Sequence, residues 1–355
     1  MTETGETVYF LGAGATRADF ATAPLGADLL HAILSTDPSS NAVRAFLESL
    51  FDASSVASDA KQEARPRLDD VLTLIDTCLS GRTPLPTALS LEELSHGKRL
   101  LVAAIGRILD ATLKGSRGLV ALRFAQVLRD DPQPVISTNY DIVLDNALVE
   151  CESVNYGVAV RAAVGRRGAM PEVRPDELIY FVSDPGSSSL VRRGDVPLLK
   201  LNGSLNWLYC PRCDELDITV MDKGALHILD SPKMGRCGNA GCTGRYEPLL
   251  VGPSLEQRYE NRILRDTWSR AEKALSAAEH LVVIGYSLPE ADYLIRAMLA
   301  RHFATRSQRV CVVSTPESSA HDAALTVRYR RLFPRCDFRW DGFSGIVDSL
   351  VRDGC

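Results

Sequence analysis

The feature that most constrains the fold of this 355-residue chain is a series of short apolar runs that each stop at small or polar residues. The runs lack alternation, which is typical of strands buried on both faces of a parallel sheet. Ligands of open α/β sheets bind beyond the carboxyl ends of the strands, so these ends predict one shared site. About six strands are expected: Val8–Leu11, Pro134–Ser137, Val196–Leu201, Leu281–Ile284, Val310–Val313 and, at an edge, Phe338–Trp340.

Helical periodicity fills most of the interval between the first two strands. One helix suffices for an ordinary crossover between parallel strands, so the surplus predicts a helical insertion. Apolar residues recur every three or four positions in Gly26–Leu34, Asn41–Phe51, Leu68–Leu79, Leu91–Leu113 and Gly118–Leu128, and again in Glu290–Phe303. The expected fold is α/β, a Rossmann-like parallel sheet with helices on both faces.

Composition and charge exclude several classes of function. The chain has 40 basic and 45 acidic residues, a net charge of −5, which argues against direct binding to nucleic acid or an anionic membrane. The longest apolar runs are too short to span a bilayer. Residues 1–7 lack the basic start and apolar stretch of a secretory signal, and a cytoplasmic location is therefore expected.

Four of the nine cysteines have the spacing of metal ligands. Cys210 and Cys213 form one close pair, and Cys237 and Cys242 form a second. Two such pairs with Pro or Gly inside each knuckle predict a zinc ribbon with four thiolates. Disulfides are the less favoured alternative in a chain without an export signal. A four-cysteine Zn²⁺ site has no open coordination position, so we predict a structural role for it.

Three polar motifs follow the predicted strands, and each has a purely structural alternative. Gly12–Thr16 reads Gly-Ala-Gly-Ala-Thr, a turn that can hold a pyrophosphate at a helix N-terminus or simply join strand to helix. Asn139 and Asp141 can hold a ribose hydroxyl and orient a water, or cap a helix. Gly285–Pro289 can admit the adenosine half of a dinucleotide, or form a turn before a helix.

Taken in order, the motifs resemble the sirtuin-like (silent information regulator) family, particularly its prokaryotic branch. The cysteine quartet follows directly after the fourth matching element, where sirtuins carry their zinc module. The resemblance implies an NAD-binding Rossmann-like domain and cleavage of the nicotinamide–ribose bond through an oxocarbenium-like state. The matching elements are Gly12–Thr16, Ser137–Asp141, Tyr156–Gly157, Lys200–Trp207 and Gly285–Asp292.

The resemblance also assigns roles to individual residues. Asn139 would orient the attacking water, and Asp141 would contact the ribose or the carboxamide side. The pyrophosphate would lie against Gly12, Ala13, Gly14 and Thr16, and the adenosine half against Gly285, Ser287 and Ser314, with Thr138 as a further cofactor contact.

One position departs from the family pattern. The family has His immediately before Gly-Ser, and this chain has Asn202 there. An imidazole accepts a proton near neutral pH and an amide does not, and loss of such a base costs about 10²- to 10⁴-fold in rate. Two explanations are open: an engineered substitution that inactivates the enzyme, or a natural residue in a weak hydrolase or an NAD sensor.

The prediction is therefore an NAD⁺ hydrolase of prokaryotic antiphage defence, with NAD⁺ as substrate and Zn²⁺ as structural metal. The alternatives are an NAD-dependent protein deacylase, whose peptide cleft the helical insertion would obstruct, and a catalytically dead sensor of NAD or ADP-ribose. Expected partners are further copies of the chain and a ring-forming ATPase or another defence protein. The predicted domains are the Rossmann-like part (1–38, 131–206 and 250–355), the helical insertion (39–130) and the zinc ribbon (207–249).

Overall fold

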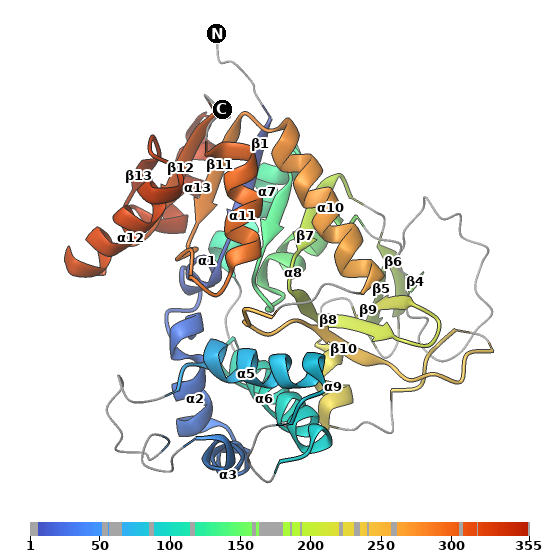
Figure 1. The fold of residues 1–355 in the computed structure, drawn as a ribbon. Coiled ribbons are helices and arrows are strands. Elements are labelled where there is room, and N and C mark those ends of the chain that lie inside the picture. The colour runs from blue at the N-terminus through green and yellow to red at the C-terminus, as the bar shows by residue number, and fades with distance from the viewer. Residues whose placement is uncertain are drawn as a thin grey trace.

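A parallel sheet of seven strands forms the centre of the computed structural model (Figure 1). Its order is β13-β12-β11-β1-β2-β7-β3, and every neighbouring pair is parallel. The strands are β1 (Thr7–Leu11), β2 (Val135–Ser137), β3 (Val154–Asn155), β7 (Val196–Lys200), β11 (His280–Ile284), β12 (Arg309–Val313) and β13 (Asp337–Arg339). The six expected strands are confirmed, and β3 is additional because two residues are too few to form a recognisable apolar run.

The structure describes most of the chain, and every statement below concerns these residues. The described ranges are 6–51, 56, 66–84, 89–113, 118–157, 161–162, 180–184, 187–191, 194–219, 223–230, 235–239, 241–256, 261–304, 308–317 and 319–353. No described helix has both the length and the apolar character needed to cross a bilayer.

Helices cover both faces of the sheet, because side chains of the buried strands point alternately to either side. Val8 and Phe10 of β1 face one core and Tyr9 and Leu11 face the other. The first core is covered by α10 (Arg262–Ala277), α11 (Tyr293–Phe303) and α12 (Ser319–Leu332), and the second by α7 (Leu119–Asp130), α8 (Val143–Glu150) and α13 (Gly342–Asp353). Figure 1 shows α10 and α11 crossing the front of the sheet.

Helix α11 begins three residues later than its apolar spacing predicted. Leu288 has a φ of 52°, in the left-handed region, and Glu290 and Ala291 form a turn. The helix therefore starts only after Asp292.

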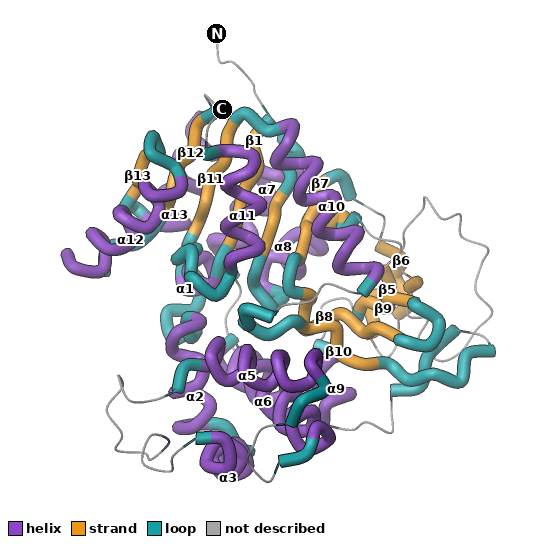
Figure 2. Tube along the Cα trace, viewed as in Figure 1, coloured by secondary structure: helices purple, strands orange, loops and turns teal. Residues whose placement is uncertain are grey.

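A second helical layer lies beyond the carboxyl ends of the sheet strands (Figure 2). It has its own apolar core and comprises η1 (Gly26–Asp28), α2 (Leu29–Thr36), α3 (Ser40–Leu50), α5 (Leu68–Gly81) and α6 (Leu91–Thr112), joined by α9 (Gly224–Asp230). Ser90 and Glu93 form a reciprocal capping box at the start of α6. The helices expected in the insertion are present, and the last of them, α7, packs on the sheet.

A smaller sheet lies between these two parts. Its order is β10-β8-β9-β4, with β8 antiparallel to both β9 and β10. The strands are β4 (Arg161–Ala162), β8 (Gly203–Cys210), β9 (Glu215–Ile218) and β10 (Glu247–Leu250), and a separate hairpin pairs β5 (Tyr180–Asp184) with β6 (Ser187–Val191). Strand β8 leads from the end of β7 to the first cysteine of the quartet.

Candidate functional site

The strand order reverses direction at β1, so the carboxyl ends of β1 and β11 form the switch point at which a binding crevice is expected. The chain passes from β1 to β2 and β7 on one side, and later to β11, β12 and β13 on the other side. Ligands of open α/β sheets bind at such a switch point. The loop after β1 carries Gly12 and Gly14, and the loop after β11 carries Gly285. Two predicted motifs from distant parts of the sequence therefore meet at the crevice.

The glycines allow the two loops to touch backbone to backbone. A Cβ on Gly12 would lie 2.6 Å from Cα of Tyr286, and one on Gly14 would lie 2.8 Å from Cα of Gly285. The amide of Gly12 donates to the Ile284 carbonyl (3.0 Å) and that of Gly14 donates to the Gly285 carbonyl (2.8 Å). These two amides therefore already donate to backbone carbonyls. The close packing of the two loops is by itself a sufficient reason for glycine at both positions. Contact between the pyrophosphate and Gly12 or Gly14 stays a prediction. The same holds for Ala13, the first residue of α1 (Ala13–Arg17).

The second motif is joined to the first by side-chain hydrogen bonds. Oγ1 of Thr16 donates to Oδ2 of Asp141 (2.8 Å), a buried contact across 125 residues of sequence. Nδ2 of Asn139 donates to the Gly12 carbonyl (3.0 Å) and to Oγ1 of Thr16 (3.3 Å). Oδ1 of Asp141 accepts from the Val143 amide (3.0 Å) at the start of α8. Asp141 thus supports the start of α8 and also holds α1 through Thr16, and its contact with a cofactor stays a prediction.

Asn202 lies at the same edge of the sheet, in the turn that follows β7, the strand next to β2. Its Nδ2 donates to the carbonyl of Thr138 (3.2 Å), and its side chain is buried. Its own carbonyl accepts from the Val251 amide (2.9 Å), in the segment after β10. The structure therefore joins Thr16, Asn139 and Asp141 through their side chains and attaches Asn202 through the Thr138 carbonyl; Thr16, Asn139, Asp141 and Asn202 are called the polar cluster below. The amide at position 202 fits its surroundings and offers no group that titrates near neutral pH.

The residues predicted for the adenosine half lie on the other side of the crevice. The amide of Gly285 donates to the Val313 carbonyl (3.0 Å), which places Gly285 beside Ser314. Ser314 is half-buried and its amide donates to the Arg339 carbonyl (2.9 Å). Ser287 is exposed, and its carbonyl accepts from Arg328. Gly285 and Ser314 thus follow adjacent strands, while Ser287 stands on the surface of the loop.

Several buried polar residues without a predicted role adjoin this cluster. Lys200 forms an ion pair with Asp145. Asp145 accepts a hydrogen bond from the Tyr156 hydroxyl, which in turn accepts one from Asn206. The sequence did offer one indication of a buried charge, because Lys200 ends an otherwise apolar strand. Asp145, by contrast, lies in an ordinary helical pattern 55 residues away, and the sequence gives no indication of the pairing.

Asp292 is the second group that sequence reasoning missed. It is 7 % exposed, and its Oδ2 accepts a hydrogen bond from the Tyr286 hydroxyl (2.7 Å). Burial raises the pKa of this carboxyl above its usual value, the hydrogen bond from Tyr286 opposes the change, and the negative charge of Asp69 adds to it. Buried carboxyl groups with a raised pKa occur both at functional sites and in structural networks, and Asp292 follows the loop that carries Gly285.

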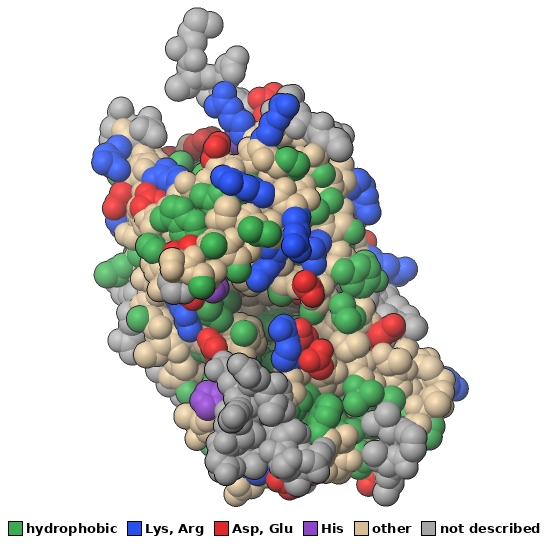
Figure 3. Space-filling model, turned by 60° about the vertical axis from the view of Figure 1, so that its left-hand side comes forward, with side chains coloured by type: hydrophobic (Ala, Val, Ile, Leu, Met, Phe, Trp, Pro, Cys, Tyr) green, Lys and Arg blue, Asp and Glu red, His purple; other side chains and the backbone are tan. Residues whose placement is uncertain are grey.

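The enclosed spaces near the cluster are too small for a dinucleotide. A cavity of about 20 Å³ lined by Thr16, Asn139, Asp141, Asp145 and Lys200 has room for about one water. A cavity of about 160 Å³ lies between α7 and α8, also below the volume of a typical ligand pocket. Figure 3 shows an open hollow between the two parts of the molecule on one face.

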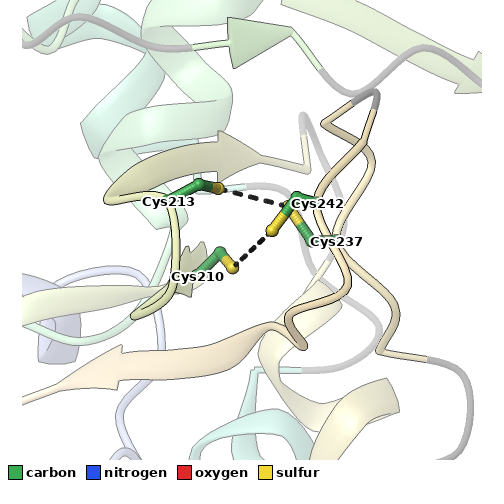
Figure 4. Close-up of side chains that lie close together, drawn as sticks. All are labelled: Cys210, Cys213, Cys237 and Cys242. Carbon is green, nitrogen blue, oxygen red and sulfur yellow. Dashed lines mark hydrogen bonds between the residues drawn. The ribbon is translucent and has the colours of Figure 1, made fainter.

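The four cysteines of the predicted ribbon converge, as Figure 4 shows. Their sulfur atoms all lie within 4.8 Å of one another, with 3.8 Å between Cys210 and Cys242 and 3.5 Å between Cys213 and Cys237. Tetrahedral zinc with bonds of about 2.3 Å requires sulfur separations of roughly 3.8 Å. A Cβ on Gly244 would lie 2.6 Å from Sγ of Cys210. The cluster is therefore compatible with a structural zinc ion held by four thiolates.

No protein-family model matches this chain, and no curated protein matches it. Several solved structures are similar to it over almost its whole length. One, from a study of the mechanism and regulation of Sir2 enzymes, has 13 % identity, a TM-score of 0.44, and coverage of 99 % of this chain and 92 % of the other. A Sir2 homologue in complex with NAD has 12 % identity, a TM-score of 0.45 and coverage of 99 % and 90 %. A Sir2 homologue variant in complex with ADP-ribose has 14 % identity, a TM-score of 0.46 and coverage of 98 % and 92 %.

Proposed function

We propose that this chain binds NAD⁺ at the carboxyl edge of its parallel sheet and belongs to the enzymes that hydrolyse the nicotinamide–ribose bond. The observation that carries the proposal is the polar cluster of Thr16, Asn139, Asp141 and Asn202. Its members come from α1, which follows β1, and from the segments after β2 and β7, so all lie at the carboxyl ends of neighbouring strands on one side of the switch point. Such a crevice is where α/β sheets bind dinucleotides, and the sequence motifs that meet there resemble those of the sirtuin-like family.

Each residue of the cluster has a chemical task under this proposal. Nδ2 of Asn139 is committed to the protein, so its Oδ1 is the atom that would accept a hydrogen bond from the attacking water. Asp141 is committed to Thr16 and to the start of α8, so it would act by holding the loop and by its negative charge. A carboxylate near the ribose stabilises the positive charge that develops as the bond to nicotinamide breaks.

Asn202 limits the rate, because no imidazole is present to accept the proton of the attacking group. We expect N202H to release nicotinamide from NAD⁺ about 10²- to 10⁴-fold faster than the parent chain. Nicotinamide is measured by chromatography, with and without an acetylated peptide. N41H, on the exposed Asn41 of α3, is the matched control and should leave the rate unchanged.

The two arms of this experiment separate hydrolase from deacylase. Release without peptide supports the hydrolase, and release only with peptide supports the deacylase. The segment after β10 supports the first outcome: the Val251 carbonyl accepts from the Tyr140 hydroxyl (2.6 Å), and the Leu255 amide donates to Thr73 of α5 (2.9 Å). This segment ties the helical layer to the sheet edge, which leaves less freedom to admit a peptide strand.

A second candidate is supported by Asn202 itself. A chain that binds NAD⁺ or ADP-ribose without consuming it would act as a sensor through a partner. Calorimetry distinguishes it: binding by the parent chain together with no turnover by N202H would favour the sensor. Absence of both binding and turnover would contradict the proposal as a whole.

The role in prokaryotic defence, the homo-oligomer and the ATPase partner remain proposals that rest on the sequence resemblance. Expression of N202H in a bacterial host should lower cellular NAD⁺ and stop growth, while the parent chain should do so much less. Light scattering of the purified chain, alone and with a co-expressed ATPase, tests the assembly.

A further inference from the structure

A buried ion pair adjoins the loop that carries Asn139 and Asp141. Nζ of Lys200 lies 2.9 Å from Oδ2 of Asp145, and each side chain is 2 % exposed. The same ammonium group also donates to the backbone carbonyl of Asp141. Lys200 is paired in register with Ser137 at the end of β2, so its side chain links the end of β7 to the loop that follows β2.

The pair belongs to a longer buried chain of hydrogen bonds. Oδ1 of Asp145 accepts from the Tyr156 hydroxyl (2.7 Å), and that hydroxyl accepts from Nδ2 of Asn206 (3.1 Å). Tyr156 and Asn206 are each 1 % exposed. Asn206 belongs to β8, the strand that ends at Cys210. The chain of contacts therefore runs from the first strand of the zinc module to the loop of the site.

On the other side, Asp141 is held through both its backbone carbonyl and its carboxylate. Its carbonyl accepts a hydrogen bond from Lys200, and its carboxylate accepts from the Thr16 hydroxyl and the Val143 amide. Thr16 in turn receives a hydrogen bond from Asn139. A displacement of the Asp141 backbone would therefore be passed on to Asn139.

Stability alone does not explain a buried ion pair. Removing two charges from water costs about as much as their attraction returns, and well-packed apolar side chains of the same volume are often as stable. A charged donor in a packed surrounding offers a fixed direction and distance for the group that it holds. What Lys200 adds beyond packing is its hydrogen bond to the Asp141 carbonyl.

We propose that Lys200 is a positioning residue for the reaction, held in place by Asp145, Tyr156 and Asn206. It fixes the backbone of residues 138–141 and thereby the side chain of Asn139. The inference deepens the proposed hydrolysis and depends on it for the activity readout alone, because the position of the loop is measured without NAD⁺.

The double variant K200M/D145L tests this role, because it removes both charges together and leaves no unpaired buried ion. We expect it to fold with the melting temperature of the parent chain. Hydrogen exchange over residues 138–143 should become at least roughly 10-fold faster, since the loop loses its anchor. In the N202H background, kcat for nicotinamide release should fall about 100-fold, as for other small misplacements of reacting groups, with KM changed far less.

The matched control is K98M/D76L, which removes another Lys–Asp pair (2.6 Å) between α6 and α5 in the helical layer. It should leave both loop exchange and kcat unchanged. A folded K200M/D145L protein with parental exchange over 138–143 overturns the positioning role.

Should that variant fail to fold, Y156F decides the matter, because it removes one hydrogen bond from Asp145 and keeps the charges. Faster exchange in Y156F at an unchanged melting temperature supports the role, and unchanged exchange overturns it. If no form of the chain releases nicotinamide, the proposed function fails and loop exchange still decides the role of Lys200.

Discussion

Asp292 illustrates how a single buried residue ties the stability of this protein to pH. Its carboxyl group has a raised pKa because burial disfavours the charged form, and the Tyr286 hydroxyl offsets part of this effect. The folded protein therefore keeps a proton at Asp292 in a pH range where the unfolded chain has lost it. Stability from this residue is fully present below the ordinary pKa of Asp, and it is lost as pH rises through the raised pKa.

D292N should remove this pH dependence, because an amide does not titrate. Relative to the parent chain, the variant gains stability as pH rises through the window, by up to about 1.4 kcal/mol for each unit between the two pKa values. Urea denaturation from pH 3 to pH 8 measures the difference. D266N, at an exposed position of α10, is the control and should follow the parent curve. A constant difference between D292N and the parent at every pH would contradict the raised pKa.

At the scale of elements, the switch point of the sheet depends on a close contact between two loops that only glycine allows. Gly285 has a φ of 62°, and a Cβ there would lie 2.2 Å from the Ala15 amide nitrogen. An alanine would therefore be strained in its backbone and would also push the two loops apart.

G285A should lower the free energy of unfolding by about 1–3 kcal/mol or more, from backbone strain alone. NAD⁺ binding, measured by calorimetry, should weaken as well, because the loops line the proposed site. G26A is the matched control: nothing lies within 4 Å of a Cβ on Gly26, and its stability should stay within about 1 kcal/mol of the parent. Equal stability of the two variants would show that the loops do not need this contact.

The sheet was largely predictable because five of its strands are mostly buried and read as short apolar runs, while β13 was expected as an edge strand and is one. Strand β3 was not, since Val154 and Asn155 acquire their strand character only from pairing with β7. The candidate site was predicted as a set of strand ends, because polar residues follow each strand, and the structure places those residues at one edge of the sheet. The internal contacts of the site were not predicted: Thr16 with Asp141 and Lys200 with Asp145 join residues far apart in sequence. The glycine motif shows most clearly what sequence cannot distinguish, since close loop packing and phosphate binding both favour glycine at the same positions.

At the scale of the whole molecule, the four-cysteine cluster is connected to the sheet edge by one strand. Strand β8 starts directly after Asn202 and ends at Cys210, and Asn206 within it contacts Tyr156. A metal that fixes one end of β8 therefore also steadies the other.

We expect about one zinc ion per chain by metal analysis. Replacement of a ligand in C213S should lower the melting temperature by roughly 5 to 10 °C and weaken NAD⁺ binding. C151S, at a partly buried cysteine outside the cluster, should bind zinc like the parent chain. Full zinc content in C213S would exclude the four-cysteine site.

The position of β1 has a consequence for how the protein is made. This strand is central in the sheet, yet one of its two neighbours, β11, ends only at Ile284. At about 5–20 residues per second, a ribosome needs on the order of tens of seconds to bridge that gap. During this time one side of β1 is an unpaired edge that can join another chain. Nascent chains of this protein should therefore depend on chaperones until β11 emerges.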